Sequence, residues 1–85
     1  DANVANVKFL MSINSDVEEF VPSLDSKITR KVVRELNLPK GMTIGGLVRN
    51  GEGMLVSGNT LIEAGDSVVV FCYNVDMKKV EKLFI

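Results

Sequence analysis

The chain has 85 residues, 46% of them hydrophobic and 25% charged, which is the composition of one small globular domain. Its formal net charge of −1 excludes the strongly basic field of a nucleic-acid-binding protein, so we expect no nucleic-acid partner. One cysteine and no histidine exclude an intrachain disulfide and the common zinc sites, and no metal site is predicted.

The first part of the chain predicts one or two strands. Residues 6–14 alternate imperfectly between apolar and polar side chains, and residues 16–23 follow closely, with a bend or bulge expected at 14–16. Pro22 has no amide hydrogen to donate to a β ladder, so the second strand is expected to end there or to lie at a sheet edge.

A helix is predicted within residues 26–39. Apolar side chains recur there at the spacing of one helical face: Ile28, Val32, Val33 and Leu36. Thr29 is placed to cap the free amides of the first turn, and Pro39 disfavours helical geometry at the residue before it. The helix is therefore expected to end by Leu38.

The middle of the chain predicts a β-hairpin. Residues 42–49 place apolar side chains on both faces, which favours a strand buried on both sides. The glycine pair at 45–46 is expected to leave room for another backbone, a helix or a ligand. The Asn-Gly pair at 50–51 suits the positive φ angles of a type I′ turn, with residues 53–57 as the returning strand.

The last third predicts the central strand and a second helix. Glycine-containing turns at 57–60 and 63–66 precede residues 67–73, whose β-branched and aromatic side chains favour the centre of a sheet. A second helical face follows, with Asn74 as its cap: Met77, Val80, Leu83 and Phe84. The expected fold class is α+β, a small mixed or antiparallel sheet with two helices.

We expect residues 1–85 to form a single domain, with 1–15 as a lead-in strand or as a linker from an upstream domain. The chain begins without methionine, which indicates a piece of a longer protein. No apolar run reaches the roughly 20 residues that cross a bilayer. The single cysteine, Cys72, lies in an apolar run and is predicted to be a small buried hydrophobe and not a reactive thiol.

No set of residues supports catalysis, so no catalytic residue is predicted. The serines have no histidine to activate them, and Asp66 is expected to form a turn with the glycine before it. The acidic cluster at 16–19 predicts a charged sheet edge more readily than a calcium site. The basic cluster at 30–34 leaves two interpretations open, a solvated helix face and an anion site.

An ordered series of motifs across residues 16–85 resembles the TrkA-C domain, also called the RCK C-terminal domain. The series runs through Ser26, "ELNLP", "TIGGLVR", "NGEG", "GNT" and "AGDSVVVF" in the order of that family. Many members place a Gly-Lys pair at the start of the helix, where this chain has Arg30 and Lys31. That difference bears on any ligand contact made there.

The resemblance implies a non-catalytic regulatory domain of a Trk-type potassium uptake system. Such domains follow a nucleotide-binding RCK domain, pair as homodimers and act on a membrane-embedded potassium transporter subunit. The resemblance therefore implies a cytoplasmic location, peripheral to the inner face of the membrane. It implies no cofactor in this chain, because the nucleotide would belong to the upstream domain. In some members a small regulator such as cyclic di-AMP binds in the dimer cleft.

If a small-molecule regulator binds, we expect it between subunits near the end of the first predicted helix. Four residues leave the helix there, where C-terminal carbonyls lack internal partners: Leu36, Asn37, Leu38 and Pro39. Asn37 can both donate and accept, and Arg49 at the end of the next strand is placed to supply a charge for a phosphate. The alternative is that Asn37 only caps the helix and Arg49 only pairs with a surface carboxylate.

Three other functions stay open on the sequence. One is the equivalent regulatory domain of another cation or anion transporter, which transmembrane spans in flanking sequence would favour. Another is a purely structural dimerisation module, which an absence of ligand binding would favour. The third is a small enzyme, against which the absence of histidine and of paired carboxylates argues.

Overall fold

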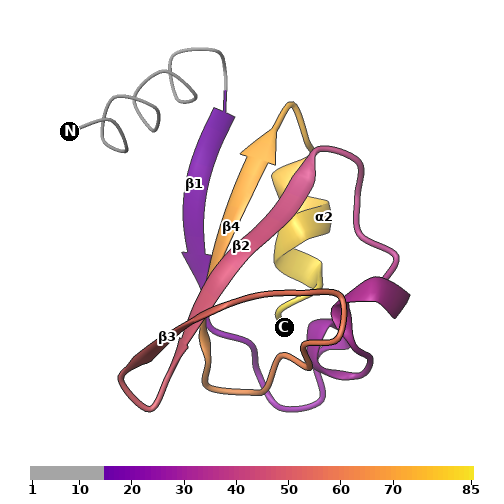
Figure 1. Cartoon of the computed structure of the whole chain (residues 1–85). Helices are drawn as coiled ribbons and strands as arrows, with labels where there is room; N and C mark the ends of the chain where they lie inside the picture. The colour runs from indigo at the N-terminus through magenta and orange to yellow at the C-terminus, as the bar shows by residue number, and fades with distance from the viewer. Residues whose placement is uncertain (1–14) are drawn as a thin grey trace, which may run out of the picture.

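The computed structural model describes residues 15–85, in which four strands form one antiparallel sheet beside a single α-helix (Figure 1). The elements in chain order are β1 (Ser15–Phe20), the 3₁₀ turns η1 (Lys27–Thr29) and η2 (Val33–Glu35), β2 (Met42–Arg49), β3 (Glu52–Leu55), β4 (Ser67–Tyr73) and α2 (Met77–Lys82). The strand predicted within residues 6–14 lies outside the described residues. The α+β class is confirmed, but the described residues contain one α-helix and not the two that were predicted.

Strand β4 lies between two neighbours, as its β-branched and aromatic composition predicted. The strand order is β1-β4-β2-β3, so β4 pairs with β1 on one side and with β2 on the other. Its side chains alternate in burial: Val68, Val70 and Cys72 are buried, whereas Val69 and Phe71 are half-buried. This alternation assigns one face of the sheet to the core and leaves the other face partly open.

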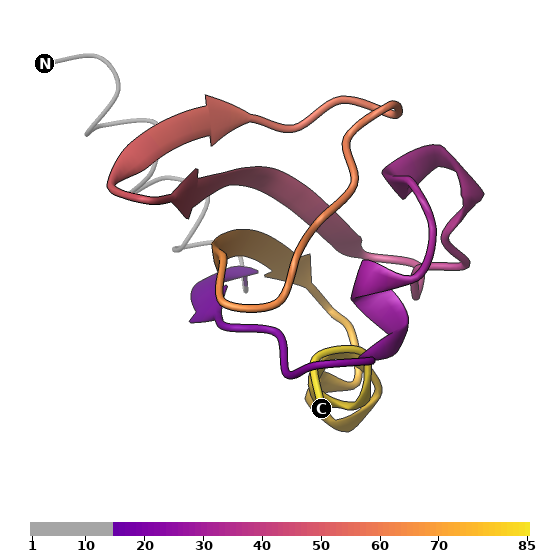
Figure 2. The same cartoon turned by 90° about the horizontal axis from the view of Figure 1, so that it is seen from below.

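The hydrophobic core lies on one side of the curled sheet. Ten residues form it: Ile28, Met42, Ile44, Leu47, Ile62, Val68, Val70, Cys72, Val80 and Phe84. In Figure 2 the β3–β4 loop (residues 56–66), the 3₁₀ turns and α2 gather on that side. The sheet therefore supplies one wall of the core, and loops and short helical segments supply the rest.

The prediction that β2 is buried on both sides is wrong. Thr43 and Val48 are exposed, whereas Met42, Ile44 and Leu47 are buried. A register irregularity between residues 44 and 46 lets both Ile44 and Leu47 face the core although they are three positions apart. Since the core elements all pack on one face, the apolar residues of β2 on the other face remain in contact with solvent.

The room predicted at the glycine pair is filled from within the chain. A side chain at Gly45 would collide with the ring of Phe71, and a Cβ at Gly46 would lie 2.9 Å from the carbonyl oxygen of Met54. Gly45 therefore allows an aromatic ring of β4 to lie against β2. No external backbone or ligand is needed to explain either glycine.

The prediction of a helix within residues 26–39 is wrong, because two of the backbone amides that the helix would use donate to carbonyls of the β3–β4 loop. The amide of Val33 donates to the carbonyl of Thr60 at 2.9 Å, and the amide of Arg34 donates to the carbonyl of Gly58 at 3.0 Å. Val32 is extended, with φ −61° and ψ 155°, so the chain forms only two separate 3₁₀ turns. Thr29 does not cap a helix: its hydroxyl donates to the carbonyl of Ser26 at 2.7 Å.

The second predicted helix is confirmed as α2, although a different residue caps it. Val80 and Phe84 are buried and Met77 is half-buried, as the periodicity predicted. The cap is Asp76, whose Oδ1 accepts from the amide of Lys78 at 3.0 Å. Asn74, which was predicted to cap, instead adopts a positive φ of 52° in the turn that precedes the helix.

Strand β1 is an edge strand that ends before Pro22, as predicted. Ser15 and Asp16 pair with Tyr73 and Cys72 in the ladder, so the bend or bulge expected at these two positions is not there. The ring of Phe20 stacks on that of Phe84, with centroids 4.7 Å apart and an interplanar angle of 13°. This contact fixes the end of β1 against the C-terminal end of α2.

The Asn-Gly hairpin is confirmed. Asn50 and Gly51 have φ angles of 52° and 80°, and the strands on either side pair from Arg49 and Glu52 outward. Two consecutive positive φ angles are the signature of a type I′ turn. The turn therefore sets the register of β2 against β3.

Replacing Gly51 with alanine should destabilise the domain by about 1 kcal/mol, because an L-residue at positive φ is strained. Gly53→Ala is the matched control, since a Cβ at either position meets no atom within 4 Å but only Gly51 has a positive φ. Thermal unfolding should give a melting temperature lower by roughly 4–8 °C for the Gly51 variant alone. Equal melting temperatures for the two variants would contradict the turn assignment.

Candidate functional site

Three of the five residues predicted to contact a ligand line one open groove. Asn37, Leu38 and Pro39 form part of its wall, and the groove has a volume of about 480 Å³. The remaining lining residues are Lys40, Asn74, Val75, Asp76 and Lys79. The groove thus lies between the segment that follows η2 and the segment that begins α2.

A tight turn at Gly41 holds the two sides of the groove together. The carbonyl of Gly41 accepts from the amide of Tyr73 at 2.9 Å, and the carbonyl of Pro39 accepts from the amide of Met42 at 3.2 Å. Gly41 has a φ of 96°, and a Cβ there would collide with the carbonyl oxygen of Tyr73. A residue with a side chain would therefore force the groove walls apart.

The groove combines an apolar surface with polar and cationic groups. Leu38, Pro39 and Val75 are half-buried and offer apolar contact, while Asn37 and Asn74 each can donate and accept hydrogen bonds. Two lysines line it, Lys40 and Lys79, and both are exposed. The Asp76 carboxylate also lies there, but one of its oxygens is used as the helix cap. Such a groove can contact a small polar ligand on two sides.

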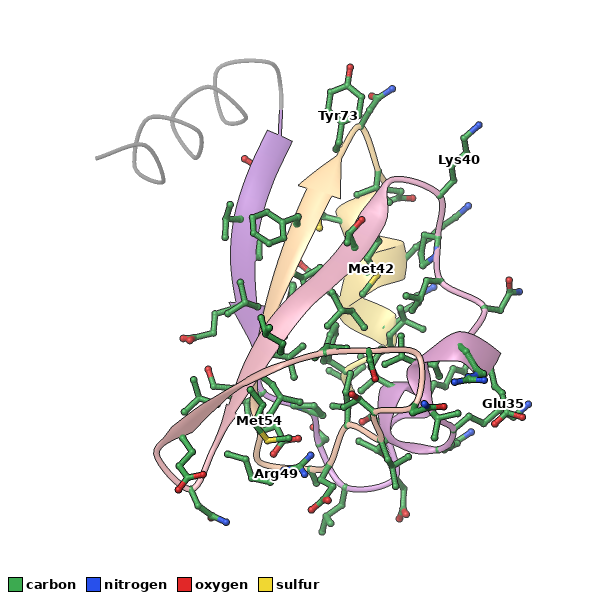
Figure 3. All side chains as sticks on the ribbon, viewed as in Figure 1. Glu35, Lys40, Met42, Arg49, Met54 and Tyr73 are labelled. Atoms are coloured by element: carbon green, nitrogen blue, oxygen red, sulfur yellow. The ribbon has the colours of Figure 1, made fainter. Side chains whose placement is uncertain are left out.

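The other two predicted ligand residues do not line this groove. Leu36 is half-buried and packs against the core. Arg49 lies at the far end of β2 from the groove. Figure 3 shows this, because Arg49 and the groove residue Lys40 are labelled at opposite ends of the strand. Within one chain, the structure therefore brings together residues 37–39 and leaves Arg49 elsewhere.

Sequence reasoning missed the half of the groove that residues 74–79, at the start of α2, supply. Asn74 and Lys79 are more than 30 positions from Pro39, and no motif connects the two segments. Asn74 was interpreted from the sequence only as a helix cap. The pairing of β2 with β4, which the backbone hydrogen bond between Tyr73 and Gly41 continues, places the two segments side by side.

Arg49 is the centre of a cluster that holds the β3–β4 loop against the sheet. Its Nε donates to Asp66 Oδ1 at 2.9 Å and its Nη2 donates to Asp66 Oδ2 at 2.7 Å, which is a bidentate pair. Nη2 also donates to the carbonyl of Leu61 at 3.0 Å, and Nη1 lies 3.2 Å from Glu63 Oε2. The guanidinium is thus surrounded by acceptors from one loop.

Asp66 does more than form the turn that the sequence predicted. Its side chain is 3% exposed, and its Oδ2 accepts from the amide of Glu63 at 2.8 Å in addition to the bonds from Arg49. These hydrogen bonds hold the pKa of Asp66 below its ordinary value of 3.8, and the bond from Arg49 has the largest effect. Burial opposes this shift. The hydrogen bond to Asp66 likewise raises the pKa of Arg49 against the effect of burial.

A second surface feature is the sheet face opposite the core, which we call the outer sheet face. Its members, placed on one side by the strand register, are Val17, Glu19, Thr43, Val48, Leu55, Val69, Phe71 and Tyr73. Leu55 is 90% exposed and Tyr73 is 54% exposed. Glu19 is the one charged residue among them, so this face is mostly apolar and partly open to solvent.

The cysteine and the acidic residues of the described part of the chain form no metal-binding cluster. Cys72 is buried, as predicted, and desolvation raises the pKa of its thiol, with smaller contributions from Glu18 and Asp16. Within this part of the chain, no three Asp, Glu, Cys or His side chains are arranged to hold a metal ion. No helix among these residues is long and apolar enough to cross a membrane.

Comparison with known proteins gives one family and several relatives. A family model described as the TrkA-C domain matches residues 17–85. Trk system potassium uptake protein TrkA of Azorhizobium caulinodans is 46% identical over 59 residues, which are 69% of this chain and 13% of that protein. The protein of the same name from Vibrio alginolyticus is 34% identical over 87 residues, covering 98% of this chain and 19% of that protein. A TrkA homolog from Archaeoglobus fulgidus is 33% identical over 60 residues, 71% of this chain and 14% of that protein.

Replacing Asp66 with asparagine should lower the melting temperature at pH 7 by on the order of 10 °C, because Arg49 loses its charged partner. The folded-state pKa of Asp66 lies below the unfolded value, so the contribution of its carboxylate is complete above the unfolded pKa near 3.8 and is lost as the pH falls through the folded pKa. The gap between wild type and Asp66→Asn should therefore close under acid.

Glu63→Gln is the control for this titration, since Glu63 is exposed and makes a single contact with Arg49. It should change the melting temperature little at any pH. A gap for Asp66→Asn that stays constant from pH 7 to pH 2 would show that the carboxylate charge does not stabilise the fold.

Proposed function

Because this chain belongs to the TrkA-C domain family, we propose that it is a non-catalytic regulatory domain of a Trk-type potassium uptake system. The match covers residues 17–85, and the relatives are named as Trk system potassium uptake proteins or their homologs. Homology to these proteins is the single observation that carries the proposal.

The chain spans less than a fifth of the length of the relatives described above. The rest of the assembly is therefore part of the proposal. We place a nucleotide-binding domain upstream, a membrane-embedded potassium transporter subunit as the partner, and the domain itself in the cytoplasm at the inner face of the membrane. Any nucleotide cofactor would bind in the upstream domain.

Homodimerisation is the first part of the proposed mechanism. A small domain without disulfide or metal has a modest core, and a partner surface adds to its stability. The outer sheet face supports this proposal, because exposed apolar surface of this kind commonly marks a protein interface. Its most exposed apolar residue is Leu55, at 90%.

Ligand sensing is the second part of the mechanism. The groove at Asn37, Leu38 and Pro39 is the proposed site, with Leu36 behind it in the core. Arg49 stays a predicted contributor, although Asp66 and Glu63 occupy its guanidinium within the chain. A ligand that prefers one dimer geometry would shift the population of the attached domains toward that geometry.

Two alternatives use the same surfaces. The domain would serve another cation or anion transporter if its flanking sequence contained membrane spans. It would be a purely structural dimerisation module if no ligand entered the groove, and the openness of the groove to solvent favours that alternative. A ligand titration distinguishes the sensor from the structural module.

We expect the chain to sediment as a dimer at concentrations near ~100 µM, because stable interfaces have dissociation constants well below that value. Leu55→Glu should shift it toward the monomer by introducing a charge into the outer sheet face. Leu24→Glu is the matched control, since Leu24 is 83% exposed but lies in the loop after β1. A monomeric wild type would overturn the proposed homodimer.

Titration with cyclic di-AMP, followed by amide NMR shifts, should perturb Asn37, Leu38 and their groove neighbours Lys40 and Asn74. Lys40→Ala combined with Lys79→Ala should weaken binding at least tenfold, because both cations line the groove. Lys31→Ala is the control, an exposed lysine that does not line the groove. Shifts confined to the acidic edge at residues 16–19 would exclude the proposed site.

A further inference from the structure

The two edges of the sheet differ in how well they resist pairing with another strand. Edge strand β1 carries three exposed carboxylates: Asp16, Glu18 and Glu19. Edge strand β3, Glu52–Leu55, carries one, with no proline and no lysine, and all four of its residues are exposed. Charges on an edge oppose strand addition, so β3 is the edge open to a further strand.

The free hydrogen-bonding groups of β3 belong to Gly53 and Leu55. In a hairpin with a two-residue turn, the residues that flank the turn form a hydrogen-bonded pair, and the type of pair then alternates along the strands. Arg49 and Glu52 flank the turn, so Glu52 and Met54 direct their amides and carbonyls toward β2. Gly53 and Leu55 direct theirs away from the sheet, where the described residues place no further strand.

We propose that β3 pairs antiparallel with β3 of a second copy of this chain, with Met54 opposite the partner's Met54. In this register Gly53 lies opposite the partner's Leu55, and each pair exchanges two hydrogen bonds. The two-fold axis gives two such pairs, so four hydrogen bonds satisfy every free group of the two edges. The inference rests on the proposed homodimer and names a strand-edge contact that would join the outer sheet faces of the two copies side by side.

A second copy suits this edge because the resulting sheet is closed to further growth. Its strand order would be β1-β4-β2-β3-β3-β2-β4-β1, so both outer edges would be the acidic β1 strands. Repulsion at these edges stops the addition of further copies, and the contact yields a dimer and not a filament. In the same register Glu52 lies opposite the partner's Val56, so the two Glu52 carboxylates do not face each other.

The side chains complement one another in this register. On the core side, Leu47 and Met54 occupy one cross-strand row, which would continue through the partner's Met54 to the partner's Leu47. Met54 is 38% exposed without a partner, and this row would cover it. On the outer face, Val48 and Gly53 share a row that the partner's Leu55 would extend.

Gly53 leaves the space that the partner's Leu55 needs. A Cβ built at Gly53 meets no atom within 4 Å, so the position is open on the outer face. The partner's Leu55 can lie across this glycine toward Val48, which is itself exposed. The most exposed apolar side chain of the hairpin thereby gains an apolar contact on each protomer.

Cysteine cross-linking tests the register. Opposite residues in a non-hydrogen-bonded pair have Cα atoms about 4.5 Å apart, which a disulfide can bridge. Met54→Cys should therefore form a disulfide dimer on mild oxidation. Leu55→Cys should not, because diagonal positions lie about 7–8 Å apart. Leu55 is the more exposed of the two, so random collision would give the reverse result.

The wild type controls for the native thiol in this experiment. Cys72 is buried and should form no intermolecular disulfide under the same conditions. Cross-linking of Leu55→Cys with none of Met54→Cys would overturn the proposed pairing.

A proline substitution tests the edge itself. Gly53→Pro removes the outward amide hydrogen and leaves the ladder to β2 intact, so it should weaken dimerisation about tenfold or more in sedimentation equilibrium. Gly53→Ala keeps the amide hydrogen, so it should dimerise more strongly than Gly53→Pro, although its methyl group takes part of the space beneath the partner's Leu55. Circular dichroism of both variants shows whether the fold is retained, and the cysteine variants decide the question if Gly53→Pro does not fold.

The two proposals fail in different ways. A dimeric wild type in which Met54→Cys does not cross-link and Gly53→Pro dimerises normally would overturn the β3 contact and leave the homodimer standing. A monomeric wild type would overturn both.

Discussion

Arg49 holds the loop between β3 and β4 against the sheet through its bidentate pair with the buried carboxylate of Asp66. The loop in turn supplies the carbonyls of Gly58 and Thr60, which accept from the amides of Arg34 and Val33. Those bonds keep residues 26–36 in two short 3₁₀ turns. The path of the chain into the groove therefore depends on an ion pair at the far end of β2.

The two ends of β2 therefore adjoin different features of the structure. The end of β2 at Arg49 is occupied by charged groups that satisfy one another, and it serves to hold a loop. The segment that leads into β2 at its other end, residues 37–40, forms one side of a groove lined by polar, cationic and apolar residues. An arginine after an apolar strand looks from the sequence like a ligand residue, whereas here its donors are used within the fold.

The two faces of the sheet differ in burial. Loops, 3₁₀ turns and α2 cover the inner face and form the core with it, as Figure 2 shows. The outer face carries apolar residues that the described elements do not cover, among them Leu55 and Tyr73. A domain of this size has too few residues to cover both faces of a four-stranded sheet. The proposed homodimer would cover part of the outer sheet face.

The features that could be predicted from the sequence alone are those that follow from the chemistry of neighbouring residues. Asn50 and Gly51 determine a type I′ turn because both adopt positive φ easily, and the run from Ser67 to Tyr73 determines a strand because its side chains suit a pleated surface. The periodicity around Val80 likewise determined α2. The family could also be identified from the order of short motifs. Each of these signals is carried by residues that are close together in the chain.

Only the tertiary structure showed that residues 26–39 form no helix, that β2 is buried on one face, and which residues line the groove. The spacing of Ile28 and Leu36 suits a helix, but carbonyls about 25 residues away take the amides that a helix would use. β2 carries apolar side chains on both faces, yet the elements that cover the sheet all lie on one face. These outcomes depend on competition among distant partners for the same hydrogen bonds and surface, which a local pattern does not contain.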